Sequence, residues 1–389
     1  MMEEAIQELK IDKSDWTPVK FGDVVCEPKE NAKDIYNEGI EHVVGLEHID
    51  TENIHLTRSG KLEESTTFSK KFSEGDVLFG RRRAYLKKAA QASFSGICSG
   101  DITVFRAKEN LMPELLPFIV CNDKFFDYAV KHSAGGLSPR VKFKDLANYE
   151  FLLPPKDQQA QLAELLWAMD EVIEGERMLF DKTQALLEAA RRKMNQGNLE
   201  VFIGDQITDL ITKGASPKWQ GFDYCNEGTL FVTSENVLED SIDLKEKKFL
   251  PLAFNYKQKR SQLMKGDILI NIVGASIGRL AIFNEEFETV NINQAVCLFR
   301  VNNTVVPEYI VNYLLEESNK DRLLNNQSAT ARPNLSLKNL SDFKFYLPSK
   351  SEQRKRMEKI SKIKDSLNNT KSQISSSQSL KKSLINQIF

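Results

Sequence analysis

A short basic stretch that contains one tyrosine is the part of this sequence best suited to chemistry. It reads Gly80-Arg81-Arg82-Arg83-Ala84-Tyr85-Leu86-Lys87-Lys88 and directly follows a strand-like segment, 76–79. We therefore expect it to form a loop. Arginine pairs bidentately with guanine or phosphate, lysine neutralises phosphate, and tyrosine packs on sugar or base. The stretch predicts contact with a nucleic acid, and an unpartnered charged hairpin is the alternative.

Three further segments have the composition of exposed loops and carry similar side chains. Residues 133–142 and 330–336 combine proline with glycine or other small residues, and residues 271–279 follow another strand-like segment. They add these candidate DNA-contact residues: Arg140, Lys142, Ser276, Arg279, Arg332 and Asn334. Arginine and asparagine have the donors and acceptors that read base edges. We expect these loops together to touch DNA, although the pattern does not single out any one residue.

Motifs for catalysis are missing. There is no Walker-type phosphate loop, and the glycines between 274 and 278 are interpreted as a turn between strands. The histidines at 42, 48 and 55 lack a second set of ligands at metal-binding spacing. The Glu-x-Lys triplets at 27–29 and 246–248 do not recur in equivalent places. The sequence therefore predicts a binding protein without catalytic residues, without a metal site and without a cofactor of its own.

The elements that must position these loops occur twice. Residues 98–159 and 292–353 align at a constant shift of 194 positions, so that segment 101–106 falls on 295–300 and 151–154 falls on 345–348. Short β-rich segments alternate with helical ones in both copies, which predicts an α+β (mixed α/β) fold with a pseudo-two-fold internal repeat. The copies share their strands and Gly-Asp turns, whereas their loops differ. Such a pattern is expected if each copy reads a different short sequence.

Each copy is followed by a long heptad segment. Apolar residues step by three or four positions in both, at Leu162, Leu166, Met169, Ile173, Phe180 and Leu187, and at Ile360, Ile363, Leu367, Ile374, Leu384 and Ile388. Polar residues interrupt both seams at matching layers, Glu176 and Thr183 against Thr370 and Ser377. A lone helix with one apolar seam is unstable, so we expect the two helices to form an antiparallel coiled-coil pair. Packing of each helix on its own domain is the alternative.

Bulk composition sets outer limits on the class of protein. A chain of 389 residues exceeds the roughly 250–300 residues of a single core, so at least two domains are expected. The five cysteines are scattered without redox or metal spacing, which is typical of reduced thiols in the cytoplasm. No apolar run approaches the roughly 20 residues of a membrane span, and the start of the chain does not look like a secretory signal. The net charge of −2 argues against a protein that coats nucleic acid but leaves room for local basic patches.

The ordered series of motifs resembles the specificity subunit of type I restriction-modification systems. The first copy shows Trp16-x-Pro18-x-x-Phe21-Gly22-Asp23, Gly75-Asp76-Val77-Leu78-Phe79, Gly96-Ile97-Cys98-Ser99-Gly100-Asp101 and Leu153-Pro154-Pro155 with Gln158-Gln159. The second copy shows Gly204-Asp205, Gly266-Asp267-Ile268-Leu269-Ile270, Asn291-Ile292-Asn293-Gln294 and Leu347-Pro348 with Glu352-Gln353. Each motif is weak alone, but the series occurs twice and covers nearly the whole chain.

This resemblance implies four segments. Residues 1–156, with a tail at 1–15, and residues 198–350 would be target recognition domains that each read one half of a bipartite site in double-stranded DNA. Residues 157–197 and 351–389 would be the helices of an antiparallel spacer. The helices would also dock two methyltransferase subunits, which hold S-adenosylmethionine and methylate adenine at N6. Motor and restriction subunits would use ATP and magnesium, and this chain would be non-catalytic and cytoplasmic, without a membrane partner.

Two other functions remain open at this point. The chain could act on DNA itself through a catalytic site that no motif reveals. It could instead be a scaffold that uses its helices as a clamp and never touches DNA.

Overall fold

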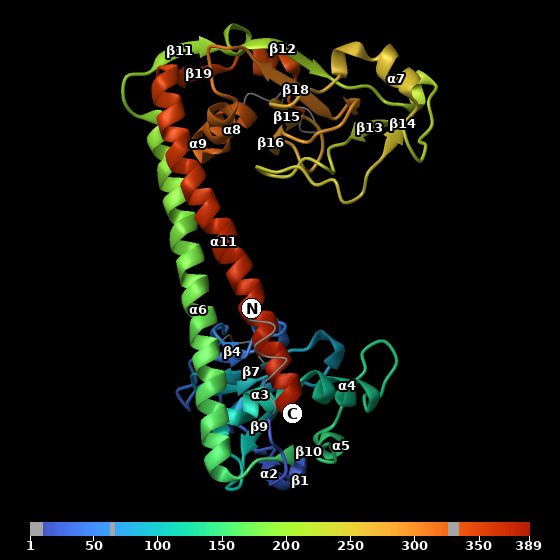
Figure 1. Ribbon diagram of the computed structural model, residues 1–389. Helices are drawn as coiled ribbons and strands as arrows, with labels where there is room; N and C mark the ends of the chain where they lie inside the picture. Colours follow the sequence, from blue (N-terminus) through green and yellow to red (C-terminus); the bar gives the residue numbers. More distant parts are fainter. Residues whose placement is uncertain (1–10, 63–66, 326–333) are drawn as a thin grey trace. The chain divides into compact units, whose positions relative to one another are not determined.

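The computed structural model describes residues 11–62, 67–325 and 334–389 (Figure 1). The chain divides into two compact units. The first combines Met1–Met178 with Lys371–Phe389, and the second is Leu179–Thr370. Both units mix helices and sheets, as the α+β prediction requires.

The first unit contains three small sheets. Its largest has the order β2-β9-β6-β7-β4, and the others have the orders β3-β8-β5 and β1-β10. The strands are β1 (Thr17–Lys20), β2 (Val25–Cys26), β3 (Val43–Val44), β4 (His55–Leu56), β5 (Lys70–Phe72), β6 (Val77–Gly80), β7 (Ala89–Ala92), β8 (Gly96–Cys98), β9 (Ile102–Ala107) and β10 (Glu150–Leu153). Both faces of β6 are buried, which explains its unbroken apolar sequence.

The helices of the first unit are mostly short. They are α2 (Phe21–Val24), α3 (Leu116–Val120), α4 (Asp123–Lys131), α5 (Phe143–Leu146), the first part of α6 (Lys156–Arg192) and the last part of α11 (Lys350–Ile388). The apolar spacing of Leu115, Ile119, Phe126 and Val130 predicts one helix from Glu114 to about Lys131, but the chain forms two helices there, α3 and α4. The Asn122 side chain accepts a hydrogen bond from the Lys124 amide and starts α4 as a new helix.

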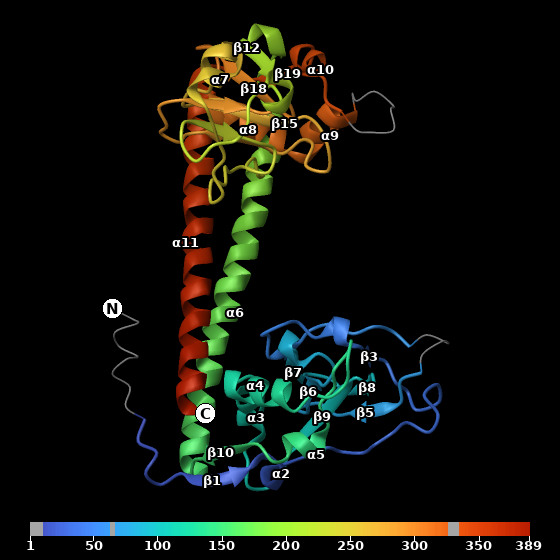
Figure 2. The same ribbon diagram turned by 90° about the vertical axis from the view of Figure 1, so that its right-hand side faces the viewer.

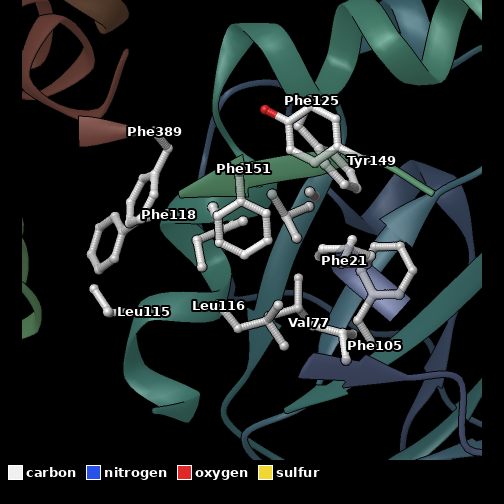
Figure 3. Packing of buried hydrophobic residues seen from close by; sticks show 14 of the residues in the cluster. Phe21, Val77, Phe105, Leu115, Leu116, Phe118, Phe125, Tyr149, Phe151 and Phe389 are labelled. Atoms are coloured by element: carbon white, nitrogen blue, oxygen red, sulfur yellow. The ribbon is translucent and has the colours of Figure 1, made fainter. Parts of the chain in front are cut away.

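Aromatic side chains fill the core of this unit (Figure 3). Phe21 lies between Phe105 and Phe125, with ring centroids 5.2 Å and 4.9 Å away. The last residue of the chain, Phe389, packs at 6.4 Å from the Phe151 ring. The end of α11 is thus part of this core, so burial of apolar area joins it to the sheet domain.

The second unit repeats part of the strand order of the first. Its sheets have the orders β12-β18-β15-β16, β14-β13-β17 and β11-β19. The order β12-β18-β15-β16 matches β2-β9-β6-β7, without a counterpart of β4, and β11-β19 matches β1-β10, whereas the three-stranded sheets have different central strands. The strands are β11 (Glu200–Ile203), β12 (Thr208–Lys213), β13 (Thr229–Val232), β14 (Phe249–Leu250), β15 (Asp267–Asn271), β16 (Leu280–Phe283), β17 (Val290–Ile292), β18 (Val296–Val301) and β19 (Lys344–Leu347). The helices are α7 (Leu252–Lys257), α8 (Pro307–Leu315), α9 (Glu317–Asn325) and α10 (Leu337–Ser341), together with parts of α6 and α11.

Individual contacts repeat along with the elements. The Gln159 side chain accepts a hydrogen bond of 2.9 Å from the Met112 amide. Its counterpart Gln353 accepts one of 2.9 Å from the Val306 amide. Both partners lie 194 positions apart in the sequence. The structure therefore reproduces the internal sequence repeat, including individual hydrogen bonds.

The long helices α6 and α11 pack together within each unit, in antiparallel fashion (Figure 2). In the first unit the Ser377 hydroxyl lies 3.2 Å from a carboxylate oxygen of Glu176. In the second, the Arg356 guanidinium donates to the carbonyl oxygen of Met194 at 3.0 Å. No helix in the described ranges is long and apolar enough to cross a membrane.

The seam positions of both helices are buried to different degrees. Leu166, Ile173, Leu187, Ile360, Leu367, Leu384 and Ile388 are buried. The half-buried members are Leu162, Met169, Phe180, Ile363 and Ile374. The hydroxyl groups of Thr183 and Thr370 donate to carbonyl oxygens of their own helices, at 2.8 Å and 2.9 Å. These two hydroxyl groups need no partner from outside the chain, whereas Oε2 of Glu176 is buried without a hydrogen-bond partner in the described residues.

Candidate nucleic-acid interface

Two of the predicted contact loops meet in the first unit, where β6 ends. The Arg83 amide donates to the carbonyl oxygen of Pro139 at 2.9 Å. The Val141 amide donates to the carbonyl oxygen of Arg81 at 3.1 Å, and Arg82 forms an isolated bridge with Arg140. Loops that lie about 50 residues apart in the sequence therefore form one surface.

Asp101 fixes two arginines of this surface. Its carboxylate lies 3.2 Å from an Arg82 nitrogen and 2.7 Å from Nε of Arg140. Partial burial alone would raise the pKa of Asp101, but the hydrogen bonds from Arg140 and Arg82 outweigh burial and lower it. Arg82 also donates to the Ser138 hydroxyl at 3.1 Å. These contacts hold the two guanidinium groups in place before any ligand binds.

The other residues of the 80–88 loop divide into two groups. Arg83 and Tyr85 are exposed, and Arg83 adopts a left-handed conformation with a φ of 54°. Arg81 is half-buried. Lys87 instead forms an ion pair of 2.5 Å with Asp123, and Lys88 donates to the carbonyl oxygen of Leu46 at 2.7 Å. The two lysines are engaged inside the unit, so Arg83 and Tyr85 are the exposed side chains that this loop offers for contact.

The neighbouring 133–142 loop adds two exposed residues. Lys142 was among the predicted contacts, and it lies at the start of α5 with an exposed side chain. Leu137 is 98% exposed at the tip of the loop. The sequence patterns did not point to Leu137, although an apolar residue between Gly136 and Ser138 was a visible signal. Apolar side chains of this kind can wedge between base steps.

The second unit has the same backbone arrangement. The Ile272 amide donates to the Ala295 carbonyl at 2.9 Å, as the Arg81 amide donates to the Asp101 carbonyl at 3.0 Å. The Leu335 amide donates to the Ile272 carbonyl at 2.9 Å. This bond matches the one from Val141 to Arg81. The loop framework at the end of β15 is therefore the one found at the end of β6.

The side chains on this framework differ between the units. Val273 and Asn334 form the isolated bridge at the positions of Arg82 and Arg140. Ala295 stands where Asp101 stands, so the ion-paired cluster has no equivalent at these positions. Two surfaces with one backbone scaffold and different hydrogen-bonding groups suit the reading of two different short sequences.

The remaining predicted residues of the second unit lie on or beside this framework. Arg279 and Asn334 are exposed. Ser276 is half-buried and accepts a hydrogen bond of 3.1 Å from the Asn271 side chain. Arg332 lies outside the described residues. Across the described parts of the chain, no group of three or more His, Cys, Asp or Glu residues is placed to hold a metal ion.

Comparisons with known proteins agree with the doubled architecture. A family described as "Type I restriction modification DNA specificity domain" matches residues 13–179 and again residues 200–376. The type I restriction enzyme EcoBI specificity subunit of Escherichia coli is 27% identical over 144 residues, which are 36% of this chain and 30% of that protein. The EcoDI specificity subunit of Escherichia coli is 28% identical over 156 residues, 39% and 35% of the two chains. The chain thus spans about a third of the length of these curated relatives.

Solved structures share the fold over nearly the full length. A chain from a study of complex assembly and conformational transition of the type I R-M system has a TM-score of 0.61 at 20% identity and covers 96% of both chains. A type I restriction-modification S subunit from M. genitalium has a TM-score of 0.57 at 17% identity and covers 98% of both chains. At these identities the likeness shows the fold alone.

Proposed function

This chain belongs to the type I restriction modification DNA specificity family, and we propose that it is the DNA-reading subunit of such a system. Each unit reads one half of a bipartite site in double-stranded DNA. The long helices dock two methyltransferase subunits, which hold S-adenosylmethionine and methylate adenine at N6. Motor and restriction subunits, with ATP and magnesium, cut DNA that lacks the methyl group. This chain itself is non-catalytic and directs the chemistry of its partners.

One observation carries the proposal. The two units place the same backbone hydrogen bonds at the ends of β6 and β15, yet they present Arg82 and Arg140 in one case and Val273 and Asn334 in the other. Phosphate contacts can be the same for any sequence, whereas base contacts require specific donors and acceptors. Two domains that recognise two different half-sites need the same backbone framework with different side chains on it.

The test is to sequence the methylated bases of a host that carries this chain and its methyltransferase. We expect adenine methylation at a bipartite site. Arg83→Ala with Arg140→Ala should relax the first unit's half-site only, and Arg279→Ala should affect the other half only. A mismatch at one base position typically costs about 1–3 kcal/mol, so relaxed positions should be visible in the methylation pattern. Simultaneous change of both half-sites by either variant would contradict the modular assignment.

The two alternative functions give different results. A DNA-acting enzyme would methylate or cut DNA when the purified chain is incubated alone with S-adenosylmethionine or magnesium. A scaffold that never touches DNA would leave DNA unbound even with its copurified partners. Under the proposal, the chain alone is inactive and the assembled complex binds DNA.

A further inference from the structure

Two aromatic side chains of the second unit are unusually exposed. Trp219 is 89% exposed in the short 3-10 turn at Lys218–Gln220, and Tyr256 is 69% exposed on α7. Single exposed apolar residues are common, but exposed aromatic side chains that lie close together can mark an interaction site. The sequence patterns did not single out either residue.

Backbone contacts on both sides of Trp219 fix the turn that exposes it. A side chain at Gly214 would come within 1.8 Å of the Ile292 carbonyl oxygen, so the chain enters this segment pressed against β17. The Phe222 amide closes the turn with a hydrogen bond of 3.0 Å to the Pro217 carbonyl oxygen. The Phe222 ring then packs on the Phe254 ring of α7 at 5.4 Å. The turn is therefore held by β17 before it and by α7 after it, and the Trp219 indole projects from a well-defined backbone.

The two segments that carry these aromatics contain only positively charged ionisable side chains, apart from Tyr256. Segments 213–222 and 251–265 contain no Asp or Glu in a chain with a net charge of −2; their cations are Lys213, Lys218, Lys257, Lys259, Arg260 and Lys265. Lys257 joins the two segments, because its ammonium group donates to the Gln220 carbonyl oxygen at 3.1 Å. No described carboxylate pairs with Lys218, Lys259 or Arg260, and all three are exposed.

We propose that Lys218, Trp219, Tyr256, Lys259 and Arg260 form a DNA-gripping surface, here called the α7 face, that binds duplex DNA without reading its sequence. The cations neutralise phosphates, and the two aromatic rings pack on the sugars of the DNA backbone. Lysine is depleted in protein–protein interfaces, so a cationic surface with several lysines fits a nucleic acid better than a protein partner. The inference rests on the proposed function and adds a contact surface outside the predicted loops.

The test measures DNA binding by the full chain in its complex with the methyltransferase subunit. Lys259→Ala with Arg260→Ala removes two free cations of the α7 face. The matched control, Lys248→Ala with Lys320→Ala, removes two cations of the same unit that are paired with Glu235 and Glu239 at 2.7 Å. Both double variants change the net charge equally. Trp219→Ala tests the contribution of aromatic packing separately.

The expected results distinguish sequence-independent binding from recognition of the base sequence. The α7-face double variant should bind cognate DNA on the order of tenfold more weakly and lower the slope of log affinity against log salt by about two, since each lost phosphate contact contributes about 0.9. Trp219→Ala should weaken binding on the order of tenfold without changing the slope. The control variant should keep both values, and the preferred sequence should stay the same in all variants.

Three results would overturn the inference. If the unaltered complex and every variant bind DNA equally, the α7 face does not touch DNA while the proposed function stands. If the α7-face variants change the preferred half-site sequence, the surface reads bases and the sequence-independent grip is wrong. Failure of the unaltered complex to bind any DNA would overturn the proposed function and this inference with it. A thermal unfolding midpoint equal to that of the unaltered chain shows that each variant is folded.

Discussion

Arg106 and Arg300 hold equivalent buried carboxylates in the two sheets. Arg106 donates two hydrogen bonds of 2.7 Å to Asp76, and Arg300 donates two of 2.7 Å to Asp267. Both aspartates are only 2% exposed. A carboxylate so deeply buried needs a charged partner with good geometry, which the arginine fork supplies. An equivalent Arg–Asp pair therefore stabilises the sheet behind the proposed contact surface in each unit.

Buried thiols give a prediction at the residue scale. Burial raises the pKa of Cys98 to about 12 and that of Cys121 to about 12, and it also raises the pKa of Cys297. A raised pKa disfavours the thiolate, so at pH 8 about one molecule in ten thousand carries a reactive thiolate at Cys98. We expect iodoacetamide to leave these three cysteines unmodified in the native chain at pH 8. They should react after unfolding in urea.

Mass spectrometry of the alkylated peptides measures this directly. Cys225 is half-exposed on a loop and serves as the internal comparison. Raising the pH toward 10 should increase labelling of Cys98 only about a hundredfold from its very low level, provided that the fold persists. Rapid native labelling of Cys98 at pH 8 would contradict the burial that raises its pKa.

The contact residues could be predicted from sequence only as loops. The run of arginines and the glycine-rich segment were visible as local patterns. Their grouping was not, because Arg82 and Arg140 are held by Asp101, which lies on a separate turn. The engagement of Lys87 with Asp123 depends equally on a residue 36 positions away. Contacts between distant segments decide which side chains are free, and a local pattern does not encode them.

Long helices with a regular spacing of apolar residues could be predicted from the sequence, whereas short helices could be predicted less well. The heptad seams indicated both long helices, α6 and α11, because their periodicity is local and sustained over many turns. The break between α3 and α4 escaped the same reasoning. The apolar positions Ile119 and Phe126 lie on either side of it at a spacing that a single helix also allows, and the capping role of Asn122 marks the start of the second helix.

Adjacent leucines on α6 give a prediction at the element scale. Leu166 is fully buried against the first unit's core, whereas its neighbour Leu165 is 42% exposed on the other side of the helix. We expect Leu166→Ala to lower the free energy of unfolding by about 3 kcal/mol, because it leaves a cavity. Leu165→Ala should lower it by less than about 1 kcal/mol.

Urea denaturation of the two variants compares them under equal conditions. Both substitutions remove the same atoms from the same helix, so intrinsic helix propensity cancels. Equal losses of stability would show that α6 does not pack through the predicted seam in the first unit.

At the scale of the whole molecule, duplication would let one chain serve the two-part target proposed for it. The repeat preserves the order of four strands in the largest sheet, the loop backbone and the glutamine contacts at the start of each long helix. It changes the side chains at Arg82 and Val273, and at Arg140 and Asn334. The α7 face adds a further difference. The two units thus share their backbone framework, whereas the side chains that would contact DNA differ between them.

Helix length should then set the length of the DNA between the half-sites. Duplicating residues 172–178 in α6 together with residues 364–370 in α11 adds one heptad to each helix and keeps both seams in register. Seven residues add roughly 10 Å of helix, which corresponds to about three base pairs at about 3.4 Å each. We expect the methylated site to keep both half-sites and to gain about three base pairs between them. Duplication in α6 alone makes the two helices unequal in length, so the end of α11 no longer matches its place in the core of the first unit. It should lower stability and abolish methylation. An unchanged spacer in the double duplication would show that helix length does not set the distance between the half-sites.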